Sequence, residues 1–256
     1  MIFIDQIFII FGFIFQLTLA QQRPKPEETE VWEPEPRLVS PGYYNSAPSD
    51  AVVLFNGADL SQWKSERNGG PVQWTINEDG SMTVKPGTGD IVTKEEHGSI
   101  QLHIEWKSPI EITGEGQGRG NSGIIFQRRY EVQVLDSYNN RTYSNGQAGS
   151  IYKQSIPLVN AMRPTGEWQV YDIVFNEPKF DSEGKMTAAG SFTVFHNGVL
   201  VQNNVKILGT TEYIGAPKTG RDEMPGYGSN TKTERYLLLQ DHSNYVSYRN
   251  IWMRKL

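Results

Sequence analysis

The sequence predicts an all-β protein built as a two-sheet antiparallel sandwich. Short runs of β-branched and aromatic residues recur along the chain, and clusters of turn-forming residues separate them, as in sandwiches and barrels. No long window carries apolar side chains at the helical period. The dipeptide Asn197-Gly198 lies between two such runs and matches a two-residue hairpin turn, which needs a positive φ angle at both positions. These observations favour strands throughout the body of the chain.

The first residues are typical of an export signal. Residues 7–20 are almost wholly apolar, and the run breaks abruptly at Gln21. A run of this length followed by small residues indicates a signal peptide over residues 1–20, although its start carries Asp5 and no basic residue. The run is short for a membrane-spanning helix. We therefore expect a secreted or periplasmic protein with no membrane span after cleavage.

Residues 21–50 form a proline-rich segment. Six of the 14 prolines of the chain lie there. Proline fixes φ and removes a backbone donor, so this spacing favours an extended path and disfavours a helix. Residues 51–256 then form one domain, with a short helical piece expected at Gly57–Gln62. The expected strands are Val52–Phe55, Trp74–Ile76, Met82–Val84, Ile100–Trp106, Ile124–Phe126, Tyr130–Leu135, Tyr171–Phe175, Phe192–Phe195, Val199–Val201, Leu237–Gln240 and Tyr245–Met253.

Composition excludes several classes of function. The chain has no cysteine, which rules out a thiol nucleophile and a Cys-type zinc site. Its formal net charge is -5 and it has no long basic cluster, so we expect no nucleic-acid partner. Residues 118–123 match G-x-G-x-x-G, but they lead into a strand rather than a helix, which argues against a dinucleotide cofactor.

The segment from Arg129 to Asp136 holds the first candidate site residues. Strand alternation places Arg129, Glu131 and Gln133 on one sheet face and the intervening apolar residues in the core. Asp136 has the wrong parity for the polar face unless a bulge intervenes. A carboxylate beside arginine and amide groups suits binding and acid–base work on a sugar. The same row could instead be a solvated outer face with an ordinary cross-strand ion pair.

The second group of candidates lies near the C-terminus and in a loop. Gln240 and His242 share a face at the end of a strand, and an imidazole titrates near neutral pH, as proton transfer requires. His242 could equally cap a turn by hydrogen bonding. Asn121 lies in the loop before a strand, either as a polar contact at the edge of a cleft or in a simple connection. No H-x-H or H-E-x-x-H spacing occurs, so we expect no metal site.

Taken in order along the chain, these motifs resemble the 3-keto-disaccharide hydrolase domain family, formerly a domain of unknown function. The resemblance covers about residues 51–256, and Arg128 and Ser243 depart from positions where family members often have glycine. The residues that carry it are Leu54–Gly57, Gly120–Ile124, Tyr130–Asp136, Gly149–Lys153, Gly166–Trp168, Asn197-Gly198, Leu239–His242 and Arg249–Trp252.

The resemblance implies a concanavalin A-like jelly roll and an enzyme exported by glycan-feeding bacteria, especially Bacteroidetes. It implies cleavage of glycosides whose glucose a partner C3-oxidoreductase has oxidised. Because a 3-keto group acidifies the C2 proton, one base and one acid would suffice. Glu131 and His242 are the candidates for these roles, in an order that the sequence leaves open. The candidate substrate-binding residues are Asn121, Arg129, Gln133, Asp136, Tyr152, Lys153, Gln240 and Arg249.

Two other functions remain open at this point. A conventional retaining glycosidase of the laminarinase type shares the jelly roll, and Glu131, Gln133 and Asp136 have the i, i+2, i+5 spacing of the bulged catalytic strand in such enzymes. Retention needs two carboxyl groups about 5 Å apart, and glutamine at the middle position argues against this function. A non-catalytic lectin-like module would need only aromatic and polar contacts to an oligosaccharide. We expect no cofactor. A divalent cation is compatible with the fold, but no ligand set is visible in the sequence.

Overall fold

The computed structural model describes residues 24–43, 46–226 and 234–256. The predicted signal peptide lies outside the described residues. The chain divides into two compact units, residues 1–38 and 39–256. The described part of the first unit has one 3-10 turn, η1 (Pro26–Glu28). None of the helices in the described segments is long and apolar enough to cross a membrane.

The second unit holds two main sheets, as predicted. The larger has eight strands in the order β13-β12-β9-β6-β15-β4-β3, with β1 also paired to β15. Its strands are β1 (Val52–Phe55), β3 (Thr75–Ile76), β4 (Met82–Thr83), β6 (Ile100–Lys107), β9 (Gln169–Asn176), β12 (Ser191–His196), β13 (Val199–Lys206) and β15 (Ser247–Lys255).

The smaller sheet has five strands in the order β2-β5-β14-β7-β8. These are β2 (Trp63–Ser65), β5 (Ile91–Glu96), β14 (Tyr236–Leu239), β7 (Ser122–Phe126) and β8 (Tyr130–Val134). A separate hairpin pairs β10 (Lys179–Phe180) with β11 (Met186–Ala188), and two further 3-10 turns are η2 (Gly116–Gly118) and η3 (Ser144–Gly146).

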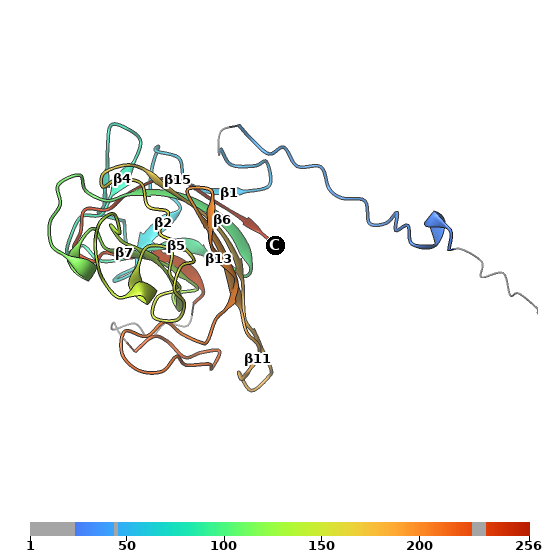
Figure 1. The fold of residues 1–256 in the computed structure, drawn as a ribbon. Helices are drawn as coiled ribbons and strands as arrows, with labels where there is room; N and C mark the ends of the chain where they lie inside the picture. The colour runs from blue at the N-terminus through green and yellow to red at the C-terminus, as the bar shows by residue number, and fades with distance from the viewer. Residues whose placement is uncertain (1–23, 44–45, 227–233) are drawn as a thin grey trace, which may run out of the picture. The chain divides into compact units, whose positions relative to one another are not determined.

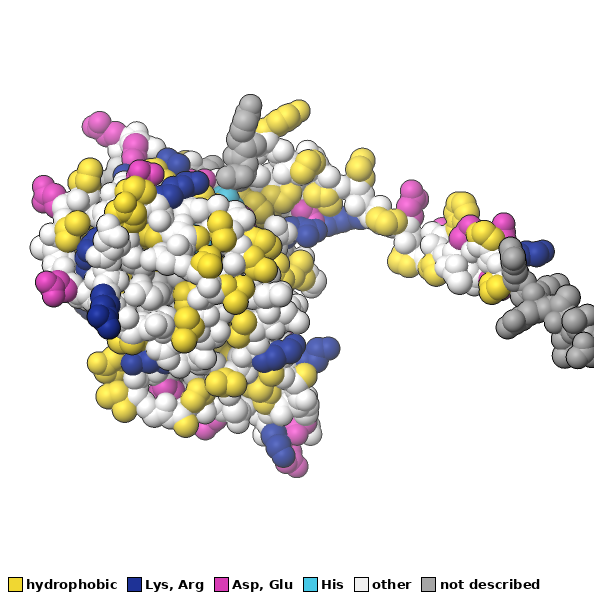
Figure 2. Space-filling model, viewed as in Figure 1, with side chains coloured by type: hydrophobic (Ala, Val, Ile, Leu, Met, Phe, Trp, Pro, Cys, Tyr) yellow, Lys and Arg dark blue, Asp and Glu magenta, His cyan; other side chains and the backbone are white. Residues whose placement is uncertain are grey.

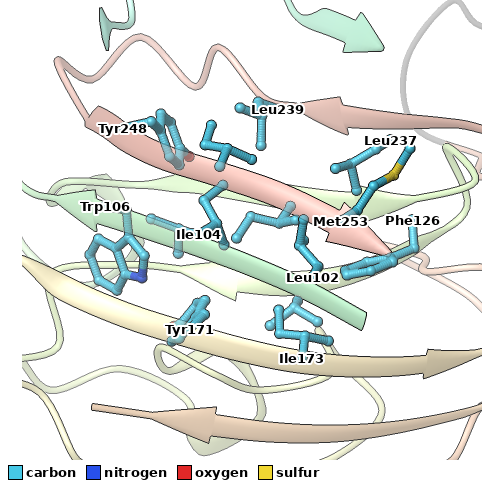
Figure 3. Close-up of a cluster of buried hydrophobic side chains, with 14 of the residues drawn as sticks. Leu102, Ile104, Trp106, Phe126, Tyr171, Ile173, Leu237, Leu239, Tyr248 and Met253 are labelled. Carbon is cyan, nitrogen blue, oxygen red and sulfur yellow. The ribbon is translucent and has the colours of Figure 1, made fainter. Parts of the chain in front are cut away.

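The strands form an antiparallel sandwich of the jelly-roll, concanavalin A-like type. Each pairing between the described strands is antiparallel. Figure 1 shows β2, β5 and β7 on one side of the body and β6, β13 and β15 on the other. Side chains from both sheets meet in one core, where Trp106 and Tyr171 of the larger sheet and Phe126 of the smaller are fully buried (Figure 3). Packing apolar inner faces together in this way is what stabilises a sandwich without disulfides.

The structure confirms the predicted hairpin turn at Asn197-Gly198 but not the predicted helix at Gly57–Gln62. Asn197 and Gly198 have φ angles of 53° and 80° and connect β12 to β13, as the sequence predicts. The short helix expected at Gly57–Gln62 is wrong, because that segment forms bends and turns. Gly57 has a φ angle of 94°, which a right-handed helix does not permit. On the face shown in Figure 2, Lys and Arg side chains lie in several separate places rather than in one basic patch.

Candidate active site

A pocket of about 240 Å³ opens on the outer face of the smaller sheet. Its walls come from β8, from the loop that precedes β7, from the end of β14 and from two loops beside β8. The lining residues are Asn121, Glu131, Gln133, Tyr152, Tyr213, Gln240 and His242. Six of these seven are candidates named from the sequence. A larger hollow near β2 carries Lys64 and Lys94 but no acid or histidine in its lining, so it lacks a proton-transfer pair.

Strand alternation in β8 builds the floor of the pocket. Tyr130, Val132 and Val134 belong to the hydrophobic core, and Glu131 and Gln133 point to the pocket. Their exposed fractions are only 3 % and 1 %. A solvated outer face would expose such long polar side chains far more, so this row is not an ordinary surface.

Glycine at position 123 makes room for the Glu131 carboxyl group. Gly123 lies opposite Gln133 in the β7–β8 register. A Cβ atom at Gly123 would lie 2.8 Å from Glu131 Oε1, which is closer than a real side chain tolerates. The carboxyl group therefore lies over the backbone of the neighbouring strand, inside the pocket.

Gln133 offers an acceptor to a ligand. Its Nε2 donates to Gln117 Oε1 at 2.9 Å, which orients the amide. Its Oε1 is buried and has no partner among the described residues. Because a buried polar atom without a hydrogen bond is costly, an unpaired oxygen in a pocket wall indicates a place for a hydroxyl group of a ligand.

Tyr152 lines the pocket next to Glu131, and Tyr143 and Lys153 lie beside it. The Tyr152 N–H donates to the Glu131 backbone oxygen at 3.1 Å. Its hydroxyl group lies 2.6 Å from that of Tyr143, and Lys153 Nζ lies 4.0 Å from the centre of the Tyr143 ring. Burial, followed by the Tyr143 contact and the nearby Glu131, raises the pKa of Tyr152 well above its ordinary value. Tyr152 therefore keeps its proton, and Lys153 lies beside the pocket rather than in its lining.

The wall formed by Gln240 and His242 is held in place by backbone contacts of Gln240 and by the Asp241 carboxylate. The Gln240 N–H donates to the Gly123 oxygen at 3.0 Å, which continues the sheet past the end of β14. Asp241 points away from the pocket and accepts a hydrogen bond from the Gly89 N–H at 2.9 Å. This contact fixes the chain on either side, so His242 is presented at the exposed edge of the pocket.

Asn121 is held from the loop side. Its Nδ2 donates to the Gln117 backbone oxygen at 2.6 Å, which leaves the side-chain oxygen for the pocket. Gln117 thus orients two lining amides, Asn121 and Gln133. Sequence reasoning missed Gln117, because its glycine-rich 3-10 turn carries no strand or helix pattern.

Besides Lys153, three sequence candidates lie outside the pocket lining, namely Arg129, Asp136 and Arg249. Arg129 directly follows the tight β7–β8 turn, and its guanidinium donates to the backbone oxygens of Glu223 and Gln127. Asp136 has the parity of the core residues, and it pairs with Arg119 at 2.8 Å inside the protein. In the described contacts, each of these two side chains binds other parts of the protein rather than facing the pocket.

Arg249 lies in the other sheet altogether. It belongs to β15, where its Nε donates to Glu105 Oε2 at 2.6 Å and its guanidinium lies 4.1 Å from the centre of the Trp168 ring. The same outer face holds His103, which contacts Asp172 at 2.7 Å. Although Arg249 is close to His242 in sequence, the chain changes sheets between β14 and β15, and this separates them.

Glu131 is the one carboxylate among the described residues that line the pocket. Its neighbours there are amides, phenols and the imidazole at the edge. This set can move a proton and hold hydroxyl groups, but it does not supply the second carboxylate of a retaining glycosidase. No group of three His, Cys, Asp or Glu side chains in the described segments could hold a metal ion.

Comparisons with known proteins show the family and the fold of the chain. The profile of the 3-keto-alpha-glucoside-1,2-lyase-like domain matches residues 50–254. A provisionally assigned glycosyl hydrolase of known structure from Parabacteroides distasonis is 49% identical, with a TM-score of 0.82; the match covers 91% of this chain and 97% of that one. A second such structure from that organism is 22% identical over 81% of this chain and 94% of that one, with a TM-score of 0.53, and shows the shared fold. No curated protein sequence matches the chain. With four-fifths of its length matched by one family profile, the chain belongs to the family of 3-keto-alpha-glucoside-1,2-lyase-like domains.

Proposed function

We propose that the protein cleaves glycosides whose glucose carries a keto group at C3, by elimination across C1 and C2 followed by hydration. The observation that carries the proposal is a pocket with one buried carboxylate, Glu131, an imidazole, His242, at its edge, and amide groups between them. A single base and a single acid suffice for elimination, whereas direct retaining hydrolysis needs two carboxyl groups. Family membership supports the same chemistry.

In the proposed reaction, Glu131 removes the proton from C2, and the electron pair forms an enolate with the C3 keto group. The C1=C2 bond then forms as the C1–O bond breaks, and the aglycone leaves as an alcohol after taking a proton from His242. Water then adds its hydroxyl group to C1 and gives its proton to His242, and Glu131, after exchanging its proton with solvent, returns a proton to C2, which yields free 3-keto-glucose. Glu131 is buried inside the pocket, where the sugar ring binds in this scheme, so it takes the role of base. His242 is exposed at the pocket edge, where the aglycone leaves, so it takes the role of acid.

The remaining wall residues bind the sugar in this scheme. Tyr152 keeps its proton, and in this scheme its hydroxyl group turns from Tyr143 to donate to the developing enolate oxygen. The unpaired Gln133 Oε1 accepts from a ring hydroxyl group, and Gln240 and Asn121 orient others. Lys153 contributes positive charge from beside the pocket, within 5.9 Å of the Tyr152 ring centre.

The test pairs two variants with two leaving groups. With a 4-nitrophenyl 3-keto-glucoside, whose aglycone needs no acid, Glu131→Gln should lose at least about a hundredfold in rate and His242→Ala should lose little. With a methyl 3-keto-glucoside both variants should lose about a hundredfold or more. Glu78→Gln, an exposed acid in the turn between β3 and β4, is the matched control and should behave as wild type.

Solvent deuterium distinguishes the competing functions. Wild type in D₂O should place deuterium at C2 of the product, because the proton that Glu131 returns to C2 has exchanged with solvent. Cleavage of unoxidised β-glucan without deuterium at C2 would instead support a retaining glycosidase. Binding of either sugar without turnover would support a lectin-like module. Wild-type rates for both variants would refute the roles assigned to Glu131 and His242.

We also propose that the protein is exported and that its substrate is supplied by a sugar C3-oxidoreductase. The apolar run at residues 7–20 supports export. The acidity that elimination requires exists only after oxidation at C3, which supports the second point. The molecular mass of the protein that is recovered outside the cytoplasm tests whether the chain is cleaved near residue 20.

A further inference from the structure

The loop over residues 207–226, which follows β13, is attached directly to the strand that carries Glu131. The Thr211 N–H donates to the Arg129 oxygen at 2.7 Å, and the Glu131 N–H donates to Thr211 Oγ1 at 2.9 Å. Thr211 is fully buried. The loop therefore extends the edge of the smaller sheet and places Tyr213, two residues later, in the pocket wall.

A buried acid, Glu212, connects the two ends of this loop. Glu212, with an exposed fraction of 5 %, accepts hydrogen bonds from Thr210 Oγ1 at 2.7 Å and from the Gly226 N–H at 2.6 Å. Lys218 Nζ lies 3.7 Å from the same carboxyl group. These contacts connect both ends of the loop on either side of Tyr213.

The residue held in this way is itself open to solvent. Tyr213 has an exposed fraction of 57 %, and the adjacent Ile214 has 82 %. The sequence from Tyr213 to Pro217 is Tyr-Ile-Gly-Ala-Pro, whose side chains offer one hydroxyl group and otherwise only apolar surface. The amides that suit sugar hydroxyl groups lie inside the pocket instead.

The size of the pocket decides what meets this surface. A volume of about 240 Å³ is below the roughly 300–1,000 Å³ of sites that enclose a drug-sized ligand. One sugar ring occupies such a pocket, and the group bonded to C1 must extend past its edge. Tyr213 lines the pocket and is largely exposed, so it can meet a group that extends past the edge of the pocket.

We infer that Tyr213 is a platform for the aglycone and that the protein prefers 3-keto-glucosides whose aglycone begins with a flat aromatic ring. This inference rests on the proposed function and names the substrate class of the same pocket. Offset stacking between two aromatic rings strengthens binding by about three- to tenfold beyond simple burial. Tyr213 is a specificity residue here, and the proton transfers remain with other side chains.

The experiment compares benzyl and cyclohexylmethyl 3-keto-glucosides of the same anomeric configuration. Both release primary alcohols of similar acidity and size, so the ratio of their kcat/KM values isolates the flat ring. Wild type and Tyr213→Phe should prefer the benzyl substrate about three- to tenfold, and Tyr213→Ala should bring the ratio close to one. Phe195→Ala, a partly exposed aromatic residue on β12 of the other sheet, is the control and should keep the wild-type ratio.

The ratio within one variant does not depend on how much of that variant is folded. An unchanged ratio in Tyr213→Ala, with wild type cleaving both substrates, overturns the inference and leaves the proposed function standing. Failure of wild type to cleave either substrate overturns both.

Discussion

Replacing Asp90 with asparagine should make the free energy of unfolding less dependent on pH. Asp90 Oδ1 accepts a hydrogen bond from the Asp241 N–H at 2.7 Å, directly behind the pocket wall. Burial, together with the nearby carboxyl groups of Glu66 and Asp241, raises the pKa of Asp90 to about 6 from an ordinary value of 3.8. Asparagine keeps the accepting oxygen and removes the charge.

The sign follows from proton linkage. The folded protein holds the Asp90 proton more tightly than the unfolded chain, so this contribution to stability is present at low pH. It is lost as the pH rises through about 6. Between pH 5 and pH 8, these two pKa values correspond to about 1.4 kcal/mol. Because Asp90 retains some solvent exposure, a loss of about 1 kcal/mol is expected in wild type.

Urea unfolding at pH 5 and pH 8 measures this directly. The stability of Asp90→Asn relative to wild type should rise by about 1 kcal/mol between the two pH values, since other titrating groups cancel in the difference. A difference between variant and wild type that stays the same at both pH values would refute the reasoning. Circular dichroism at each pH establishes that both proteins start folded.

Two further outcomes follow from the geometry around β8. Gly123→Ala should reduce turnover of a 3-keto-glucoside by about tenfold or more, because the new Cβ atom displaces the Glu131 carboxyl group. Its melting temperature should stay close to that of wild type while its kcat falls. A large drop in melting temperature that accompanies the loss of kcat would contradict this explanation. Asp136→Ala should lower the free energy of unfolding by about 3–5 kcal/mol, since it leaves Arg119 buried without its partner. Denaturant unfolding measures that loss, and a change below about 1 kcal/mol would show that the pair matters little.

The periodicity of the chain predicted most of its strands and the face of β8, and it missed β2, β5, β10 and β11. Alternation is local, because successive side chains point to opposite sides of any strand. It therefore identified Glu131 and Gln133 on the polar face and the apolar residues between them in the core. The Asn197-Gly198 turn was predictable for the same reason, since its two φ angles depend on those residues alone.

Pairing between distant segments decided the rest, and it cannot be read from local pattern. Arg249 follows His242 by seven residues, but β14 pairs within the smaller sheet and β15 within the larger, which moves Arg249 to the opposite face of the sandwich. Asp136 forms an ion pair with Arg119, 17 residues earlier in the chain. The Arg129 side chain donates a hydrogen bond to the distant Glu223 backbone oxygen instead of lining the pocket. Tyr213 carries no sequence signal, because only the contact of Thr211 with β8 brings its loop to the pocket. The sequence by itself determined which side chains could serve a site, and tertiary contacts determined which of them share one.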